Sequence, residues 1–298
     1  MNYRPVGKSG LSVSETGFGC MSLAKAPDAE ATAIVHTAVD AGINYFDTAD
    51  LYDKGANEEL IGKLLKPVRS KIVLATKVGN RWKDDGSGWD WNPTKDYILK
   101  AVDESLRRLQ TDYIDLYQLH GGTMDDPIDE TIEAFEQLVQ QGKIRHYGIS
   151  SIRPNVIRAY TEESNIISVM LQYSLLDRRP EETVLDLLKT NGMGVMVRGA
   201  LAQGLLAGKA PKEYLGHPVS TVQSAAGQVK KQATASGTTP SAWATQYVLN
   251  NPAVSSVVTG ISTMEQLLEA IAPRPQPDAA WFDELERSVP ASQYREHR

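Results

Sequence analysis

The sequence predicts a (β/α)8 (TIM) barrel that forms a single domain over residues 1–298. Strand-like apolar runs and helical patterns alternate about eight times, which predicts parallel strands joined by right-handed crossovers. The length suits such a barrel, which takes about 250 residues plus insertions. An open doubly wound sheet is the alternative, but it usually carries a glycine-rich dinucleotide turn after its first strand. The nearest match, Gly17–Ser22, lacks the third glycine.

The predicted strands are short apolar runs bounded by turn or cap residues. Several of them lack strict alternation of polar and apolar residues, which is typical of strands buried on both faces of a parallel sheet. The predicted strands are Thr16–Cys20, Asn44–Asp47, Ile72–Lys77, Ile114–His120, Arg145–Ser150, Ser168–Tyr173, Gly194–Arg198 and Ser255–Val258.

Helical patterns lie between these strands. Each shows apolar residues at helical spacing, with a capping residue before it or a glycine after it. The clearest four are a helix capped by Asp28 and stopped by Gly42, one capped by Thr94, one that ends before Gly142, and one between Pro180 and Gly192.

Two stretches are longer than ordinary loops. Residues 79–93 are rich in Gly, Asp and Trp, and we expect them to form a loop beside the substrate. Residues 206–239 are rich in Gly, Ala and Thr with only a weak helical signal, and we expect an insertion on the cofactor side. Both follow predicted strands, so in a barrel both lie at the C-terminal face, where active sites are found.

Composition excludes several classes of protein. With 31 basic and 37 acidic residues the net charge is −6, which argues against nucleic acid as the main partner. No stretch approaches the roughly 20 apolar residues of a membrane span, and the first eight residues do not resemble a signal peptide. Lone Cys20 cannot form an internal disulfide, and no His/Cys cluster has metal-ligand spacing. We expect a cytoplasmic protein without metal; the oligomeric state is not indicated.

Four polar residues stand at or just after the ends of successive predicted strands: Asp47, Tyr52, Lys77 and His120. In a barrel these strand ends converge on one mouth. A tyrosine in water is a poor acid at neutral pH, but a neighbouring ammonium favours its ionised form. Such a group can donate a proton to a developing oxyanion while a histidine binds the carbonyl oxygen. Each residue alone has an ordinary structural explanation, but the ordered set favours a catalytic role.

Sequence motifs around these residues resemble those of the aldo-keto reductase family. Asp47–Tyr52 reads DTADLY, Leu74–Lys77 reads LATK and Leu116–His120 reads LYQLH, similar to the motifs that carry the family's catalytic tetrad. Gly142–Ser150 and Leu171–Ser174 resemble its fifth and sixth strand segments. The resemblance extends from about residue 3 to about residue 270. It is greater to the bacterial and potassium-channel β-subunit-like branch than to the aldose reductase branch.

The resemblance implies a barrel that binds NADPH without a Rossmann domain and reduces a small aldehyde or ketone by hydride transfer. Tyr52 would be the general acid, Lys77 and Asp47 would tune it, and His120 would orient the carbonyl. The alternative is a regulatory module of the channel β-subunit type, which binds NADPH with little turnover.

The resemblance also assigns cofactor residues. Tyr173 would stack on the nicotinamide, Ser150 and Gln172 would bind its carboxamide, and Arg198 would be a charge partner of the pyrophosphate. The resemblance implies NADPH in preference to NADH. The chain lacks the basic residue that many relatives place near Ser262, so the expected preference for NADPH is smaller than in those relatives. The complete set is Gly19, Cys20, Met21, Ser150, Ser151, Gln172, Tyr173, Arg198, Gly199, Leu201, Gly204, Leu206, Gly260, Ser262, Thr263 and Gln266.

Three tryptophans in the 79–93 stretch are candidates for the substrate pocket: Trp82, Trp89 and Trp91. Aromatic side chains beside a catalytic mouth often line such pockets. A self-packed surface loop is an equally good interpretation of any one of them. After His120 the chain continues Gly121-Gly122, where many relatives have a bulkier residue, which would open the pocket at this edge.

Overall fold

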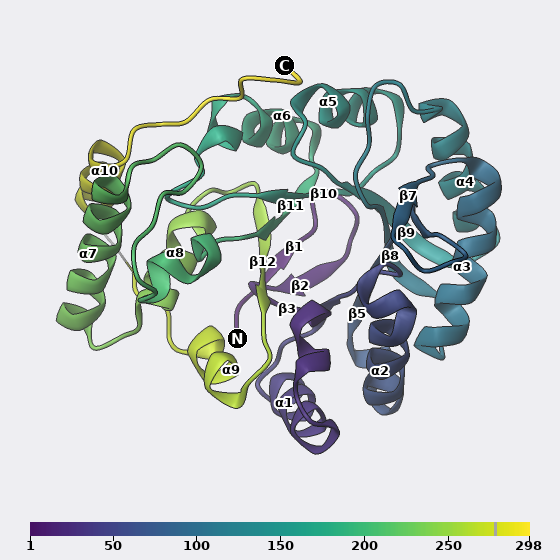
Figure 1. Cartoon of the computed structure of the whole chain (residues 1–298), viewed down its shortest axis with the longest axis horizontal. Coiled ribbons are helices and arrows are strands. Elements are labelled where there is room, and N and C mark those ends of the chain that lie inside the picture. Colours follow the sequence, from purple (N-terminus) through teal and green to yellow (C-terminus); the bar gives the residue numbers. More distant parts are fainter. Residues whose placement is uncertain (277–278) are drawn as a thin grey trace.

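The computed structural model, which describes residues 1–276 and 279–298, is a closed barrel of eight parallel strands surrounded by helices (Figure 1). This confirms the predicted fold class. Around the barrel the strands follow the order β10-β11-β12-β3-β4-β5-β8-β9. Their bounds are β3 Thr16–Gly19, β4 Tyr45–Asp47, β5 Val73–Val78, β8 Ile114–Leu119, β9 Ile144–Ser150, β10 Ser168–Gln172, β11 Gly194–Arg198 and β12 Val254–Gly260.

An N-terminal hairpin packs against the barrel interior. Strand β1 (Tyr3–Pro5) pairs antiparallel with β2 (Ser12–Ser14). Val6 and Val13, beside and within this hairpin, are buried in one cluster with Tyr45, Met170 and Met196 from the barrel strands. The interior is therefore a packed core.

Helices cover the outside of the barrel with their apolar faces turned inward. In α3, for example, Ile98, Val102 and Leu109 are buried at helical spacing. The helices are α1 Asp28–Asp40, α2 Ala56–Leu65, α3 Lys95–Leu109, α4 Ile128–Gln140, α5 Pro154–Glu163, α6 Val184–Asn191, α7 Val219–Ser236, α8 Pro240–Leu249, α9 Met264–Ile271 and α10 Ala279–Ser288. Short 3₁₀ segments are η1 Cys20–Lys25, η2 Tyr52–Gly55, η3 Lys66–Lys71, η4 Arg179–Glu182 and η5 Ala202–Ala207.

Two of the predicted helix caps differ in detail. Helix α1 begins at Asp28 itself, with Pro27 in the capping position, so Asp28 lies in the first turn, where its charge suits the helix dipole. Thr94 does precede α3, but its hydroxyl donates to Asn92 Oδ1 at 2.7 Å and makes no capping hydrogen bond.

The two long stretches contain regular structure that the sequence did not predict. Residues 79–93 hold an antiparallel hairpin, the Trp hairpin, formed by β6 (Asn80–Trp82) and β7 (Trp89–Trp91). Residues 206–239 include helix α7, which buries Val222, Ala225, Val229 and Ala233. These small residues at helical spacing give little hydrophobic signal, which explains why the sequence shows only a weak helical pattern over α7.

Alternation of side chains along the strands decides what faces the barrel axis. Met170 and Met196 belong to the interior cluster, whereas Val169, Leu171, Val195 and Val197 pack under the surrounding helices. The same two-residue period carries on to the strand ends. In the described ranges 1–276 and 279–298, no helix is long and apolar enough to cross a membrane.

Candidate active site

A buried ion pair lies at the C-terminal ends of neighbouring strands β4 and β5. Lys77 Nζ is 2.5 Å from Asp47 Oδ2 and also donates to the carbonyl oxygen of Thr48 at 2.7 Å. Asp47 Oδ1 accepts from Gln118 Nε2 at 3.2 Å, and the two charged residues are 4% and 1% exposed. Tyr45 and Ala75 face the barrel interior, so residues 47 and 77, two positions further on, face the mouth.

Tyr52 and His120 complete the predicted tetrad. The ring of Tyr52 lies 5.3 Å from Lys77 Nζ and 5.9 Å from the ring of His120, which it meets edge to face. All four predicted residues line one cavity. The structure thus brings together Asp47, Tyr52, Lys77 and His120, hereafter the tetrad.

The electrostatics give the two basic side chains different charges. Burial opposes protonation of Lys77, but the Asp47 carboxylate outweighs it, so the pKa of Lys77 lies above its usual value and the ammonium persists. Burial, aided by the cations of Lys77 and Arg198, lowers the pKa of His120 to about 3. His120 is therefore neutral near pH 7, and its buried Nδ1 has no hydrogen-bond partner in the parts of the chain described. A neutral imidazole can bind a carbonyl oxygen but is a poor proton donor.

The tetrad opens into a cavity of about 1520 Å³. That exceeds the roughly 300–1,000 Å³ of a pocket for one drug-sized ligand, so the cavity has room for more than one small ligand. Glycines in the lining let a ligand approach the backbone closely. They are Gly19, Gly121, Gly199, Gly216 and Gly260. The lining also contains the hydroxyls of Ser150 and Ser151 and the cation of Arg198. These hydrogen-bond donors suit a long anionic ligand that carries a planar polar group at one end.

Half of the predicted cofactor residues line this cavity: Gly19, Cys20, Met21, Ser150, Ser151, Arg198, Gly199 and Gly260. The others lie elsewhere. Ser262, Thr263 and Gln266 form the start of α9, where Thr263 Oγ1 accepts from Gln266 N, and Ser262 N and Oγ donate to Gln266 Oε1. Leu201, Gly204 and Leu206 lie in or beside η5, and Leu206 is buried in the core.

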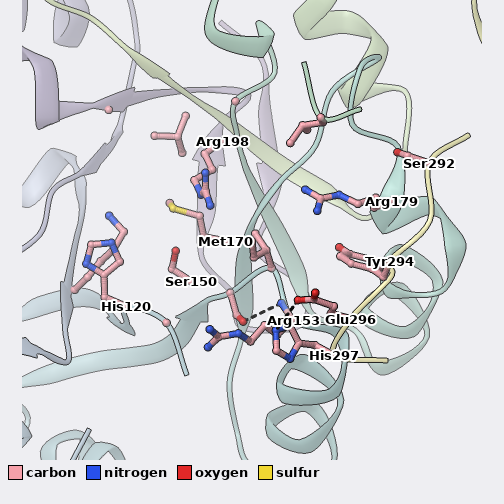
Figure 2. Close-up of a pocket in the computed structure, with 18 of the residues that line it drawn as sticks. His120, Ser150, Arg153, Met170, Arg179, Arg198, Ser292, Tyr294, Glu296 and His297 are labelled. Carbon is pink, nitrogen blue, oxygen red and sulfur yellow. Dashed lines mark hydrogen bonds and ion pairs between the residues drawn. The ribbon is translucent and has the colours of Figure 1, made fainter. Parts of the chain in front are cut away.

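Tyr173 does not reach the cavity. It shares the outward face of β10 with Val169 and Leu171, packs 6.1 Å from the ring of Tyr247, and donates its hydroxyl to Glu181 Oε1 at 2.9 Å. The alternation of the strand instead turns Met170 inward, and Arg198 reaches the cavity from β11 (Figure 2). The sequence assignment of Tyr173 overlooked this parity.

Gln172 lies beside the cavity and holds Arg198. Its Oε1 accepts from Arg198 Nη1 at 3.1 Å, while its Nε2 donates to Asp177 Oδ2 at 2.9 Å and to the Tyr214 hydroxyl at 3.3 Å. Both N–H groups of the amide are therefore engaged with protein groups, and its oxygen already accepts from Arg198.

None of the three tryptophans is among the cavity-lining residues. Trp82 Nε1 donates to the Leu51 carbonyl at 3.1 Å, and Trp91 Nε1 donates to Asp126 Oδ1 at 2.9 Å. Trp89 is 50% exposed. The structure does not bring these rings into the cavity lining, although Leu51, which Trp82 contacts, is part of it.

One wall of the cavity was not predicted. Residues 290–298, the C-terminal segment, line it opposite His120, with Arg198 and Met170 between (Figure 2). The segment is tied to the β10–α6 connection and to the first turn of α5. Ser292 Oγ accepts from Arg178 N at 3.2 Å, Tyr294 N donates to Glu182 Oε2 at 3.1 Å, and His297 O accepts from Asn155 N at 2.9 Å. It has no periodic pattern and no motif, so no sequence signal could have indicated it.

Comparison with known proteins identifies the class. The family model described as "Aldo/keto reductase family" matches residues 15–275. The chain therefore belongs to the aldo-keto reductase family and is an oxidoreductase, as the sequence motifs indicated. Members of this family use nicotinamide cofactors and act on small carbonyl compounds.

Individual relatives agree with this. The chain is 51% identical over 280 residues to the uncharacterized oxidoreductase YqkF of Bacillus subtilis (strain 168), covering 91% of this chain and 90% of that one. It is 35% identical over 288 residues to L-galactose dehydrogenase of Arabidopsis thaliana, covering 91% and 88%. Among solved structures it is similar to the holo form of aldo-keto reductase AKR11C1 from Bacillus halodurans, with a TM-score of 0.92 and 47% identity over 100% and 99% of the two chains.

Proposed function

We propose that this protein reduces aldehydes or ketones to alcohols with NADPH and that Tyr52 is the general acid. The observation that carries the proposal is the buried Lys77–Asp47 pair, whose ammonium lies 5.3 Å from the Tyr52 ring beside a neutral His120. A fixed positive charge in a dry site stabilises a phenolate far more than it would in water.

The tetrad residues have distinct tasks in this reaction. The Tyr52 hydroxyl gives its proton to the carbonyl oxygen, and Lys77 stabilises the phenolate that remains. Asp47 and the Thr48 carbonyl hold Lys77 in place. His120 donates one hydrogen bond that orients the carbonyl, and its neutrality leaves Tyr52 as the proton source. The bound cofactor supplies the hydride.

The cavity residues provide the means to hold NADPH. Ser150 and Ser151 can bind the carboxamide, and the guanidinium of Arg198 offers a flat cationic face in the same cavity. The glycines Gly19 and Gly260 leave room for the backbone approach of the dinucleotide. The 2′-phosphate would bind at the start of α9, where the hydroxyls of Ser262 and Thr263 stand at a helix N-terminus.

Two measurements test the proposal. NADPH oxidation in the presence of a panel of aldehydes and ketones should show turnover well above background. In Tyr52→Phe the kcat should fall by about 10²–10⁴-fold, because the hydroxyl acts only as charge develops in the transition state. The dissociation constant of NADPH should not change. Full turnover in Tyr52→Phe would remove Tyr52 from this role, and tight NADPH binding without turnover in the parent would favour a regulatory module.

A further inference from the structure

The turn that carries Tyr52 has an unfavourable backbone. Directly after Tyr52, Asp53 (φ 51°), Lys54 (φ 55°) and Gly55 (φ 89°) are all left-handed. Two of these are ordinary L-residues, for which the left-handed region is costly. Hydrogen bonds within the turn are long: Tyr52 N is 3.2 Å from Ala49 O, and Lys54 N is 3.4 Å from Leu51 O. Contacts from outside the turn must therefore hold it.

The Trp hairpin supplies such contacts on both sides of Tyr52. Before Tyr52, the Leu51 carbonyl accepts from Trp82 Nε1 at 3.1 Å. After it, Lys54 Nζ lies 5.1 Å from the centre of the Trp82 ring and donates to Gly86 O at 3.4 Å. One indole thus contacts the residue before Tyr52 through its N–H and a residue after Tyr52 through its π face.

The same hairpin is tied to the His120 side of the mouth. Asn80 Nδ2 donates to the His120 carbonyl at 3.3 Å, and Trp91 packs against Gly121 while its Nε1 donates to Asp126 at 2.9 Å. Asn92 N donates to Gly79 O at 2.7 Å and closes the base of the hairpin. Tyr52 and His120 come from different strand ends, and the hairpin connects the backbones of both.

We infer that Trp82 is a positioning residue that fixes the Tyr52 hydroxyl relative to Lys77 and His120. This inference rests on the proposed role of Tyr52 as the general acid. Since proton transfer depends on heavy-atom geometry, a turn that relaxes from its left-handed form moves the hydroxyl away from the carbonyl oxygen and slows the chemical step. Trp82 acts through the backbone of Leu51 and does not touch the substrate.

The test uses Trp82→Phe, which removes the N–H donor and keeps an aromatic ring for Lys54. We expect kcat to fall roughly five- to tenfold, as for the loss of one hydrogen bond that supports the transition state, with KM unchanged for every substrate. Rates are expressed per NADPH-binding site, so unfolded protein does not count. Trp243→Phe is the matched control, because buried Trp243 on α8 also loses a single Nε1 bond, to Ser236 Oγ at 2.9 Å, far along the chain from the tetrad.

A rescue experiment separates positioning from general damage. Asp53→Gly makes the left-handed conformation at position 53 inexpensive, so combining it with Trp82→Phe should restore part of the lost kcat. Asp53→Ala should restore none. The inference is overturned if Trp82→Phe keeps the parent kcat, if its KM rises with substrate size as for a pocket residue, if Trp243→Phe loses as much, or if Asp53→Gly restores nothing. Loss of turnover in Tyr52→Phe alongside any of these results would leave the proposed function standing.

Discussion

The tetrad and the wall opposite it are built in different ways. The tetrad residues extend from the ends of β4, β5 and β8 or from the turn after β4. The charged pair is almost fully buried and is held by Gln118 on β8 and by the Thr48 carbonyl just after β4. The opposite wall consists of Arg198 at the end of β11, the 215–217 turn and the C-terminal segment, and the last two lie on irregular backbone. Three of the four tetrad residues thus stand at strand ends, whereas most of the opposite wall stands on loop and terminal segments, which usually tolerate change better than strands do.

The largest expected effect concerns Lys77, the cation of the tetrad. In Lys77→Met, kcat should fall by at least about 10²-fold, because Tyr52 loses the charge that stabilises its phenolate. The free energy of unfolding should fall by about 3–5 kcal/mol, because Asp47 is left buried without its partner. Urea denaturation measures the second effect.

The double variant Lys77→Met/Asp47→Asn separates these two effects. It removes the unpaired buried charge and keeps an oxygen for Gln118, so most of the stability should return while kcat stays low. Recovery of activity together with stability would show that Lys77 has only a structural role.

An intermediate effect concerns the neutral His120. Its pKa of about 3 lies below the usual 6.5, so between these pH values the unfolded chain binds more protons than the folded one. Stability due to this group therefore falls as pH is lowered through that window. From pH 6.5 to 5 the parent should lose about 2 kcal/mol more than His120→Gln does. Equal losses, measured by urea denaturation at the two pH values, would mean that His120 is protonated in the folded protein.

The smallest expected effect concerns the affinity for NADPH at the start of α9. Residues 260–266 contain no basic side chain, and Ser262 already donates to Gln266. Ser262→Arg should strengthen NADPH binding by roughly tenfold through a charge-assisted contact to the 2′-phosphate, and should leave NADH binding unchanged. Quenching of tryptophan fluorescence measures both dissociation constants, with Ser262→Gln as the neutral control. An unchanged NADPH affinity in the arginine variant would place the phosphate elsewhere.

The sequence predicted the tetrad more completely than the wall opposite it, for physical reasons. The sequence shows apolar runs, typical of buried strands, that end at Asp47, Lys77 and His120. A barrel brings these strand ends together regardless of the conformation of the loops. Tyr173 was misplaced because a strand end alone does not say which face its last side chain occupies. Helix α7 was missed because alanines carry little hydrophobic signal, and the C-terminal segment because it has neither periodicity nor motif.

The order of these parts along the chain has a consequence for how such a protein can diversify. The tetrad is complete by His120, whereas Ser150, Arg198, the start of α9 and the C-terminal segment all come later. We therefore expect substitutions in the exposed cavity-lining segments beyond residue 150 to alter ligand binding more than proton delivery.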